Sequence, residues 1–152
     1  MKTTQAIFIT LGSAIALTIV GIMSYDTIAA LLLPKMDHMQ FTVTVIGTQF
    51  SNAIWFGMVC GLLPIALYSI WLATHTKENR KKLLSTILIL VCMLTALITR
   101  YFVIKSAAQK INISQENITM NTYDMNNLHY ALYLFFGLLA GTLISFIILK
   151  RK

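Results

Sequence analysis

Charged residues are scarce in this chain, and acidic residues are the scarcest. Of 152 residues, 5 are Asp or Glu and 12 are Lys or Arg, so that 11% are charged, whereas a soluble domain carries about 25%. Hydrophobic residues make up 57% of the chain, which is more than a small domain can bury in a core of its own. This composition excludes an ordinary soluble domain and indicates that lipid covers most of the surface.

Cysteines and catalytic motifs are also few. Cys60 and Cys92 both lie in apolar runs and form no C-x-x-C pair, which argues against a thiol oxidoreductase. The sequence shows no Ser-His-Asp set, no paired carboxylates and no glycine-rich phosphate loop. We therefore expect a non-enzymatic protein.

Four long apolar runs are the main positive feature. Each is long enough to cross the ~30 Å hydrocarbon core of a bilayer as a helix. The first run is too long for the apolar part of a signal peptide and is expected to be an uncleaved span. The sequence predicts one all-α integral membrane domain, residues 1–152, with four antiparallel transmembrane helices at about 6–30, 52–73, 83–104 and 128–149.

The net charge of +7 is distributed unevenly over the predicted loops. The cations at the two termini and in the central loop are Lys2, Lys77, Arg80, Lys81, Lys82, Lys150, Arg151 and Lys152. The other two loops and the nearby span end hold Lys35, Arg100, Lys105 and Lys110. Because cations favour the cytoplasmic side, both termini are predicted to be cytoplasmic in the inner (plasma) membrane. The charge thus indicates anionic lipid headgroups and not nucleic acid.

The two outer loops are harder to interpret. The segment 35–51 contains an alternating stretch, Phe41–Val45, but a lone strand would leave its edges unpaired beside a bilayer. We expect a short interfacial helix there instead. The segment 105–127 is predicted to be a long polar loop.

Three polar residues are expected near the outer ends of the spans. Asp26 lies in the outer third of the first span, Arg100 in the outer third of the third, and His129 opens the fourth. A charge within hydrocarbon usually faces the bundle and has a partner, so an Asp26–Arg100 ion pair is predicted. This set is either a polar vestibule for an ion or small ligand, or a structural clamp in which Arg100 reaches the headgroups.

Thioether and imidazole groups on the outer side suit copper, because soft sulfur selects Cu(I) and imidazole accepts either oxidation state. The candidate metal ligands are Met36, His38, Met39 and His129. Softer donors at mid-span depth are Met58, Cys60, Cys92 and Met93. The alternative is that these methionines only fill apolar space.

Two GxxxG stripes favour close helix packing, one at Gly57 and Gly61 and the other at Gly137 and Gly141. The stripes are compatible with packing within the chain, with a homo-oligomer or with a larger membrane complex.

Four short motifs support a resemblance to a known group. They are Leu33-Pro34, Gln49-Phe50, Thr99-Arg100-Tyr101 and Leu128-His129. With this layout, the chain resembles a group of small four-span bacterial membrane proteins that are distantly similar to the membrane domain of copper-resistance D proteins. The resemblance implies a link to metal handling and no mechanism.

Two function classes follow. The first is a multi-pass inner-membrane protein for ion or copper-like metal homeostasis or transport. The second is an interaction protein, either an accessory subunit of a membrane complex or an immunity protein against a pore-forming toxin. The lipid bilayer is the partner that both classes require.

Overall fold

A computed structural model describes residues 3–33, 39–42, 46–76, 78–114, 121–124 and 128–150. In chain order its elements are α1 (Thr3–Leu31), β1 (Met39–Thr42), α2 (Ile46–Ala73), α3 (Asn79–Ser114), β2 (Asn121–Asp124) and α4 (Tyr130–Lys150). Within these ranges, four helices are long and apolar enough to cross a membrane. The prediction of four membrane-length helices is therefore confirmed.

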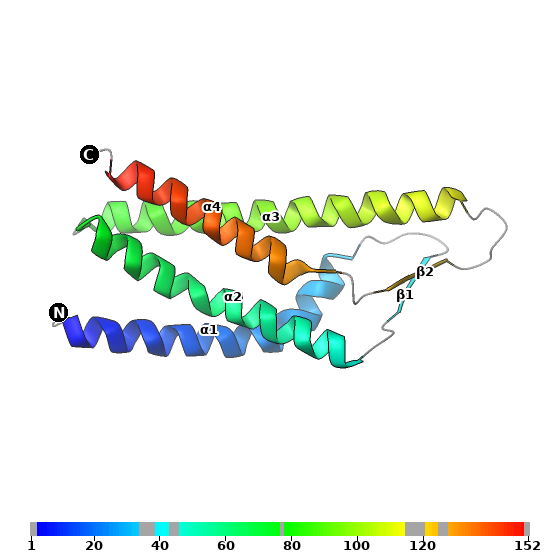
Figure 1. Cartoon of the computed structure of the whole chain (residues 1–152), viewed down its shortest axis with the longest axis horizontal. Coiled ribbons are helices and arrows are strands. Elements are labelled where there is room, and N and C mark those ends of the chain that lie inside the picture. Colours follow the sequence, from blue (N-terminus) through cyan, green and yellow to red (C-terminus); the bar gives the residue numbers. More distant parts are fainter. Residues whose placement is uncertain are drawn as a thin grey trace.

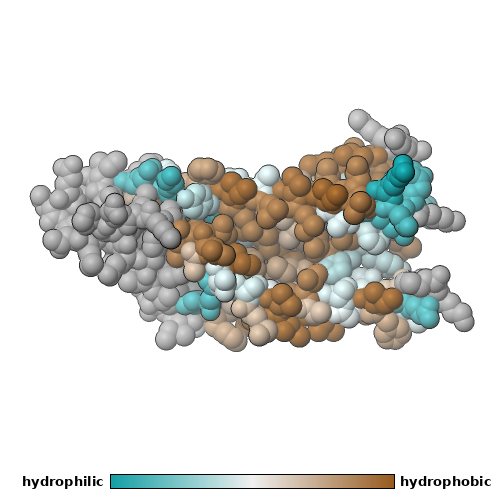
Figure 2. All heavy atoms as spheres, turned by 180° about the vertical axis from the view of Figure 1, so that it is seen from behind, coloured by the Kyte–Doolittle hydropathy of each residue, from teal (hydrophilic) through white to brown (hydrophobic). Residues whose placement is uncertain are grey.

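The helices satisfy their polar groups internally, as an apolar environment demands. Thr10 and Thr18 donate their hydroxyls to the carbonyl oxygens of Ala6 and Ala14, each over 2.9 Å. Large apolar side chains point outward, for example Phe8, which is 71% exposed. Figure 2 shows such side chains as a broad hydrophobic band across the middle of the molecule, with hydrophilic residues toward both ends.

The helices associate as two pairs, α1 with α2 and α3 with α4, and α2 also packs on α4. Glycines allow the close approach within the first pair. A Cβ atom at Gly21 would lie 2.8 Å from the Cα of Gly57, and one at Gly57 would lie 2.6 Å from the carbonyl oxygen of Thr18. Residue numbers rise on α1 as they fall on α2, and Figure 1 shows the two chain ends at the same end of the bundle.

The second pair is built in the same way. A Cβ atom at Gly137 would lie 2.7 Å from the carbonyl oxygen of Cys92, and one at Gly141 would lie 2.8 Å from the Cα of Ile89. Both GxxxG stripes therefore face a neighbouring helix of the same chain. Of the alternatives left open by the sequence, packing within the chain is the one found, and the glycine faces are not available to a second copy.

A polar contact fastens the helices at the end where the chain termini lie. The indole Nε1 of Trp71 on α2 donates to the hydroxyl of Ser85 on α3 over 2.9 Å. The hydroxyl of Ser145 on α4 donates to the backbone oxygen of the same Ser85 over 3.4 Å. Ser85 is fully buried, so three helices meet around one small polar residue.

At the opposite end, the expectations for the two loops were only partly met: a helix does lead into the second span, because α2 already begins at Ile46, but each of the two segments also contains a strand. β1 lies where an interfacial helix was predicted, and it pairs in parallel with β2, with Met39 opposite Asn121 and Thr42 opposite Asp124. The strand was rejected because its edge would be unpaired, but the other loop supplies the partner. We call this end of the bundle the strand end.

The third helix also differs from the prediction, because α3 continues to Ser114 and does not end near residue 104. Its 36 residues span about 54 Å, well beyond a ~30 Å hydrocarbon core. Ile104 and Ala108, one turn apart on this extension, are fully buried. The extended part of α3 contacts β2, and Figure 1 shows it reaching past the other helices toward the strands.

Candidate functional site

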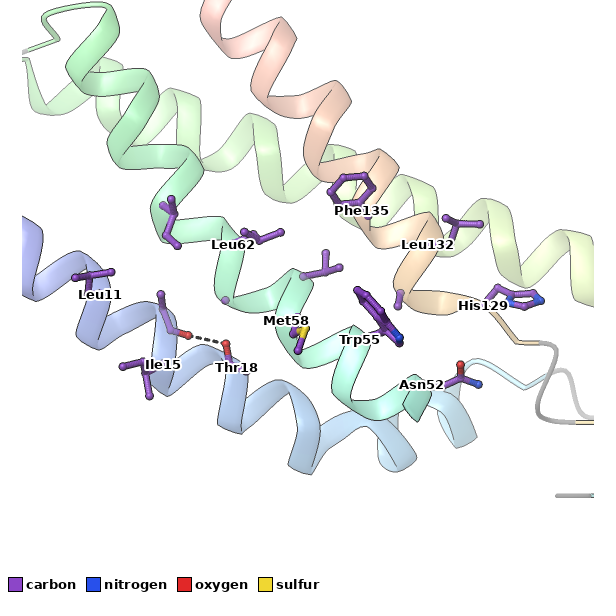
Figure 3. Close-up of a pocket in the computed structure, with 15 residues that line it drawn as sticks. Leu11, Ile15, Thr18, Asn52, Trp55, Met58, Leu62, His129, Leu132 and Phe135 are labelled. Carbon is purple, nitrogen blue, oxygen red and sulfur yellow. Dashed lines mark hydrogen bonds between the residues drawn. The ribbon is translucent and has the colours of Figure 1, made fainter. Parts of the chain in front are cut away.

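A groove of about 710 Å³ opens on the side of the bundle. Its walls are α1 and the beginning of α4, and α2 forms its floor (Figure 3). The groove exists because the helices pack as two pairs: α1 packs on α2 but not closely on α4, so the space between α1 and α4 is left open. A volume of this size is within the range of small-molecule sites, about 300–1,000 Å³.

The inner part of the groove is apolar. Leu11 and Ile15 come from α1, Met58 and Leu62 from α2, and Leu132 from α4. All five side chains are exposed in the isolated chain.

The polar atoms of this inner part are already used. Thr18 lines the groove, but its hydroxyl donates to the carbonyl oxygen of Ala14, as the dashed line in Figure 3 shows. The small residues Ala14 and Gly61 face each other across the α1–α2 contact, since a Cβ atom at Gly61 would lie 2.9 Å from the Ala14 carbonyl oxygen.

Polar side chains other than Thr18 line the groove toward the strand end. Asn52 of α2 and His129 lie there, and the ring of Trp55 stands between them and the apolar part (Figure 3). The backbone oxygen of His129 accepts the amide hydrogen of Leu132 over 3.1 Å, so His129 starts the first turn of α4. Its φ of 49° lies in the left-handed region, which a residue with a Cβ atom adopts at a cost. The start of α4 therefore holds an exposed imidazole in a defined place at the groove mouth.

The structure does not pair Asp26 with Arg100. Asp26 is exposed on α1, and its carboxylate accepts a 2.9 Å hydrogen bond from the amide of Gln49 on α2. Arg100 is 9% exposed on α3, and its Nε donates to the backbone oxygen of Leu128 over 2.7 Å. The predicted ion pair is absent from the described residues, because α1 and α3 belong to different helix pairs. Only Arg100 and the Leu128-His129 segment are brought together.

The candidate copper ligands are only partly described. Met36 and His38 lie outside the described residues, and Met39 is placed on β1. Cys60 lies beside Gly21 in the α1–α2 contact, and Cys92 lies beside Gly141 in the α3–α4 contact. The two thiols thus belong to separate helix pairs. In the part of the chain that the structure describes, no three His, Cys, Asp or Glu side chains form a cluster.

Sequence reasoning missed the groove altogether. Trp55, Leu62 and Leu132 entered the sequence analysis only as parts of the predicted spans. No local pattern marks them, since each helix is apolar on every face and the groove arises from which helices pair. A signal for the polar end of the groove is the spacing of Trp55 and Asn52. They lie three residues apart on α2, so an indole donor and a polar side chain are close together on the helix surface.

The four membrane-length helices and their exposed apolar surface define a multi-pass helical membrane protein. Comparison with protein-family models, with curated proteins and with solved structures finds no match for this chain. The groove and the contacts around it are therefore the basis for a functional proposal.

Proposed function

We propose that this chain is a non-enzymatic binding protein of the plasma (inner) membrane, which holds a hydrophobic partner in the groove between α1 and α4. The observation that carries the proposal is the groove itself: it opens on the side of the bundle, most of its lining is apolar, and its polar side chains other than Thr18 lie at one end. Binding sites in helical membrane proteins are lined in this way, with few polar groups that orient the ligand. A binding role of this kind belongs to the proposed interaction class, which also includes accessory subunits and immunity proteins.

The proposed topology is four antiparallel spans with both termini in the cytoplasm. It is supported by the cations next to the chain ends and between α2 and α3, such as Arg80, Lys81 and Lys82. The positive-inside rule favours the cytoplasmic side for such clusters of cations. The groove mouth at the strand end then faces the outer leaflet. A reporter that works only in the cytoplasm should be active when it is fused after Lys152. Activity at the same position of a reporter enzyme that works only outside the cytoplasm would contradict this orientation.

Photo-crosslinking in cells tests the binding proposal. A photoreactive amino acid replaces Leu132 inside the groove or Leu143 outside it, both on α4 and 51% and 64% exposed in the isolated chain. We expect a single defined adduct from position 132, lipid or protein, and only a diffuse mixture from position 143. The same diffuse mixture from both positions would overturn the proposal.

Metal homeostasis or transport is a second candidate, and one observation favours it. The β1–β2 pairing joins the segment that carries Met39 to the segment that precedes His129, with Met39 on one strand opposite Asn121 on the other. Copper content of the purified chain is the test. Stoichiometric copper that is lost in a Met36/His38/Met39 triple alanine variant, but kept in His75→Ala, would support this function. A copper-free sample after growth with added copper would exclude it.

A further inference from the structure

We propose that the ligand of the groove is one acyl chain of a lipid, with the oxygen-bearing head of that lipid at the strand end beside Trp55 and His129. This inference rests on the binding function proposed above and names its ligand. The competing occupant is a transmembrane helix of another protein, and three properties of the groove favour the lipid.

The first property is size. A transmembrane helix is a cylinder about 10–12 Å wide that crosses a ~30 Å core, which corresponds to a volume on the order of 2,000–3,000 Å³. The groove holds about 710 Å³, so only one ridge of side chains could enter it. A single flexible hydrocarbon chain fits a space of this volume and can follow its shape.

The second property is the kind of residue on the walls. Helices in membranes dock closely where small residues let the backbones approach. Here the small residues Ala14 and Gly61 are occupied by the α1–α2 contact. Apart from Ala131 on α4, most of the side chains left facing the apolar part of the groove are large, such as Ile15, Leu62 and Leu132. They offer dispersion contacts to a chain but no flat surface for a helix backbone.

The third property is the distribution of polar atoms. Thr18 keeps its hydroxyl bonded within α1, so the inner groove presents no hydrogen-bond donor from that residue. At the strand end the groove is lined by the indole of Trp55, a group that only donates, and by the exposed imidazole of His129. Ester, phosphate and carboxylate oxygens of a lipid head are acceptors, so their chemistry complements this end.

The length of the groove agrees with this assignment. Its floor runs along α2 from Asn52 to Ile65, which corresponds to about 20 Å of helix. One leaflet of the hydrocarbon core is about 15 Å deep. The apolar part below Trp55 is therefore about as long as one lipid tail, and the polar end lies at the level of the headgroups.

Native mass spectrometry of the full chain tests the inference. The chain is reconstituted in vesicles of palmitoyl-oleoyl phosphatidylethanolamine and phosphatidylglycerol, extracted in mild detergent and weighed with its bound molecules. Leu62→Trp fills the groove from its floor on α2, and Leu132→Trp fills it from the wall formed by α4. Leu143→Trp adds the same indole to an exposed position of α4 that does not line the groove.

The expected result is one retained phospholipid per chain in the natural protein and in Leu143→Trp. Both groove variants should retain about tenfold less, which is the effect of excluding about two methylene groups from an apolar site. Trp55→Phe keeps the ring and removes the N–H donor, and it should weaken retention about fivefold. A parallel sample with oleate in place of phospholipid shows whether a free carboxylate head serves as well as an ester and phosphate.

Three results would overturn the inference. Equal lipid retention in the groove variants and in Leu143→Trp would show that the lipid lies elsewhere on the surface. If a protein co-purifies with the natural chain and Leu62→Trp releases it, the occupant of the groove is a helix of that protein and not a lipid. The binding function would then still hold. A groove that yields neither a lipid nor a crosslinked protein would remove the binding function as well. Each groove variant must first show the melting temperature of the natural chain.

Discussion

The Nε atom of Arg100 donates a 2.7 Å hydrogen bond to the backbone oxygen of Leu128, and the guanidinium lies 5.2 Å from the ring centroid of Tyr133. Leu128 directly precedes α4 and Tyr133 lies in its first turn, whereas Arg100 belongs to the half of α3 that is nearer the strand end. A charged donor that is 9% exposed is thereby satisfied by a carbonyl and by an aromatic face. This contact fixes where α4 begins, and with it the position of His129 at the groove mouth.

Removing this guanidinium should destabilise the chain. In Arg100→Met the apolar stem is retained, but the carbonyl oxygen of Leu128 loses its charged donor. We expect the free energy of unfolding to fall by about 2–3 kcal/mol, the size of a buried hydrogen bond to a charged group. Tyr133→Leu, which removes only the cation–π contact, should cost about 0.5–2 kcal/mol. Thermal unfolding in detergent measures both.

A double-mutant cycle separates this arrangement from the ion pair expected from sequence. Because Asp26 contacts Gln49 and not Arg100, the effects of Asp26→Asn and Arg100→Met should add within about 0.5 kcal/mol. A coupling energy above about 1 kcal/mol would show that the two charges interact, and would restore the predicted pair.

Glycines at the helix contacts should tolerate no side chain. In Gly57→Ala the new Cβ would lie 2.6 Å from the Thr18 carbonyl oxygen, and in Gly141→Ala it would lie 2.8 Å from the Cα of Ile89. Backbone atoms cannot move aside as a flexible side chain can, so the helices must separate. We expect each variant to lose about 1–3 kcal/mol of stability, as over-packed cores do.

Gly12 is the matched control for these substitutions. It lies on α1 as Gly21 does, but a Cβ atom there would have nothing within 4 Å. Gly12→Ala should therefore leave stability unchanged or raise it by up to about 1 kcal/mol, because alanine favours the helix. If Gly12→Ala is as damaging as Gly57→Ala, close packing is not the reason for the glycines.

The four helices could be predicted from sequence because a long apolar run is a local property. A run of about 20 apolar residues leaves the backbone few options in a bilayer. The first three helices cover their predicted spans, and α4 begins two residues inside its span, at Tyr130. The predicted helix ends were less accurate. The third helix, α3, continues to Ser114, well past the predicted span end near residue 104, because the polar residues after the apolar run remain helical.

The strands and the groove could not be predicted, since both depend on partners that are distant in sequence. The alternating stretch at Phe41 was recognised, but a strand was rejected because no partner strand was evident from the sequence. The partner is β2, in which Tyr123 lies opposite Phe41. Arg100 was correctly expected to need a partner, but that partner is a backbone oxygen, and every residue has one. The groove depends on α1 packing against α2 and not against α4, and no residue of either helix predicts this choice of partner.

The contact between Trp71 and Ser85 should contribute to stability at the end where the termini lie. Trp71→Phe removes the 2.9 Å hydrogen bond to the Ser85 hydroxyl and weakens the stacking of Lys82, whose Nζ lies 5.4 Å from the ring centroid. We expect a loss of about 1–2 kcal/mol in thermal unfolding. Trp55→Phe is the control, because Trp55 is 61% exposed and its replacement in lipid-free detergent should change the melting temperature little. Equal shifts for both tryptophans would contradict the assignment.

His75 ends α2 in a conformation that usually belongs to glycine. Its amide donates to the oxygen of Leu72 over 3.2 Å, and that of Thr76 donates to the oxygen of Trp71 over 3.0 Å. This pair of bonds is the Schellman motif, in which the residue after the helix is left-handed. The φ of His75 is 48°, so its Cβ atom is held close to the backbone at a cost of about 1–2 kcal/mol.

His75→Gly should therefore raise the melting temperature of the chain, although it removes a whole side chain. Glycine adopts the left-handed conformation freely, and the gain should be about 1 kcal/mol after the added freedom of the unfolded chain is subtracted. His75→Ala removes the same imidazole but keeps the Cβ atom, so it should not stabilise. If alanine and glycine raise the melting temperature equally, the imidazole is responsible for the cost, and the backbone conformation is not.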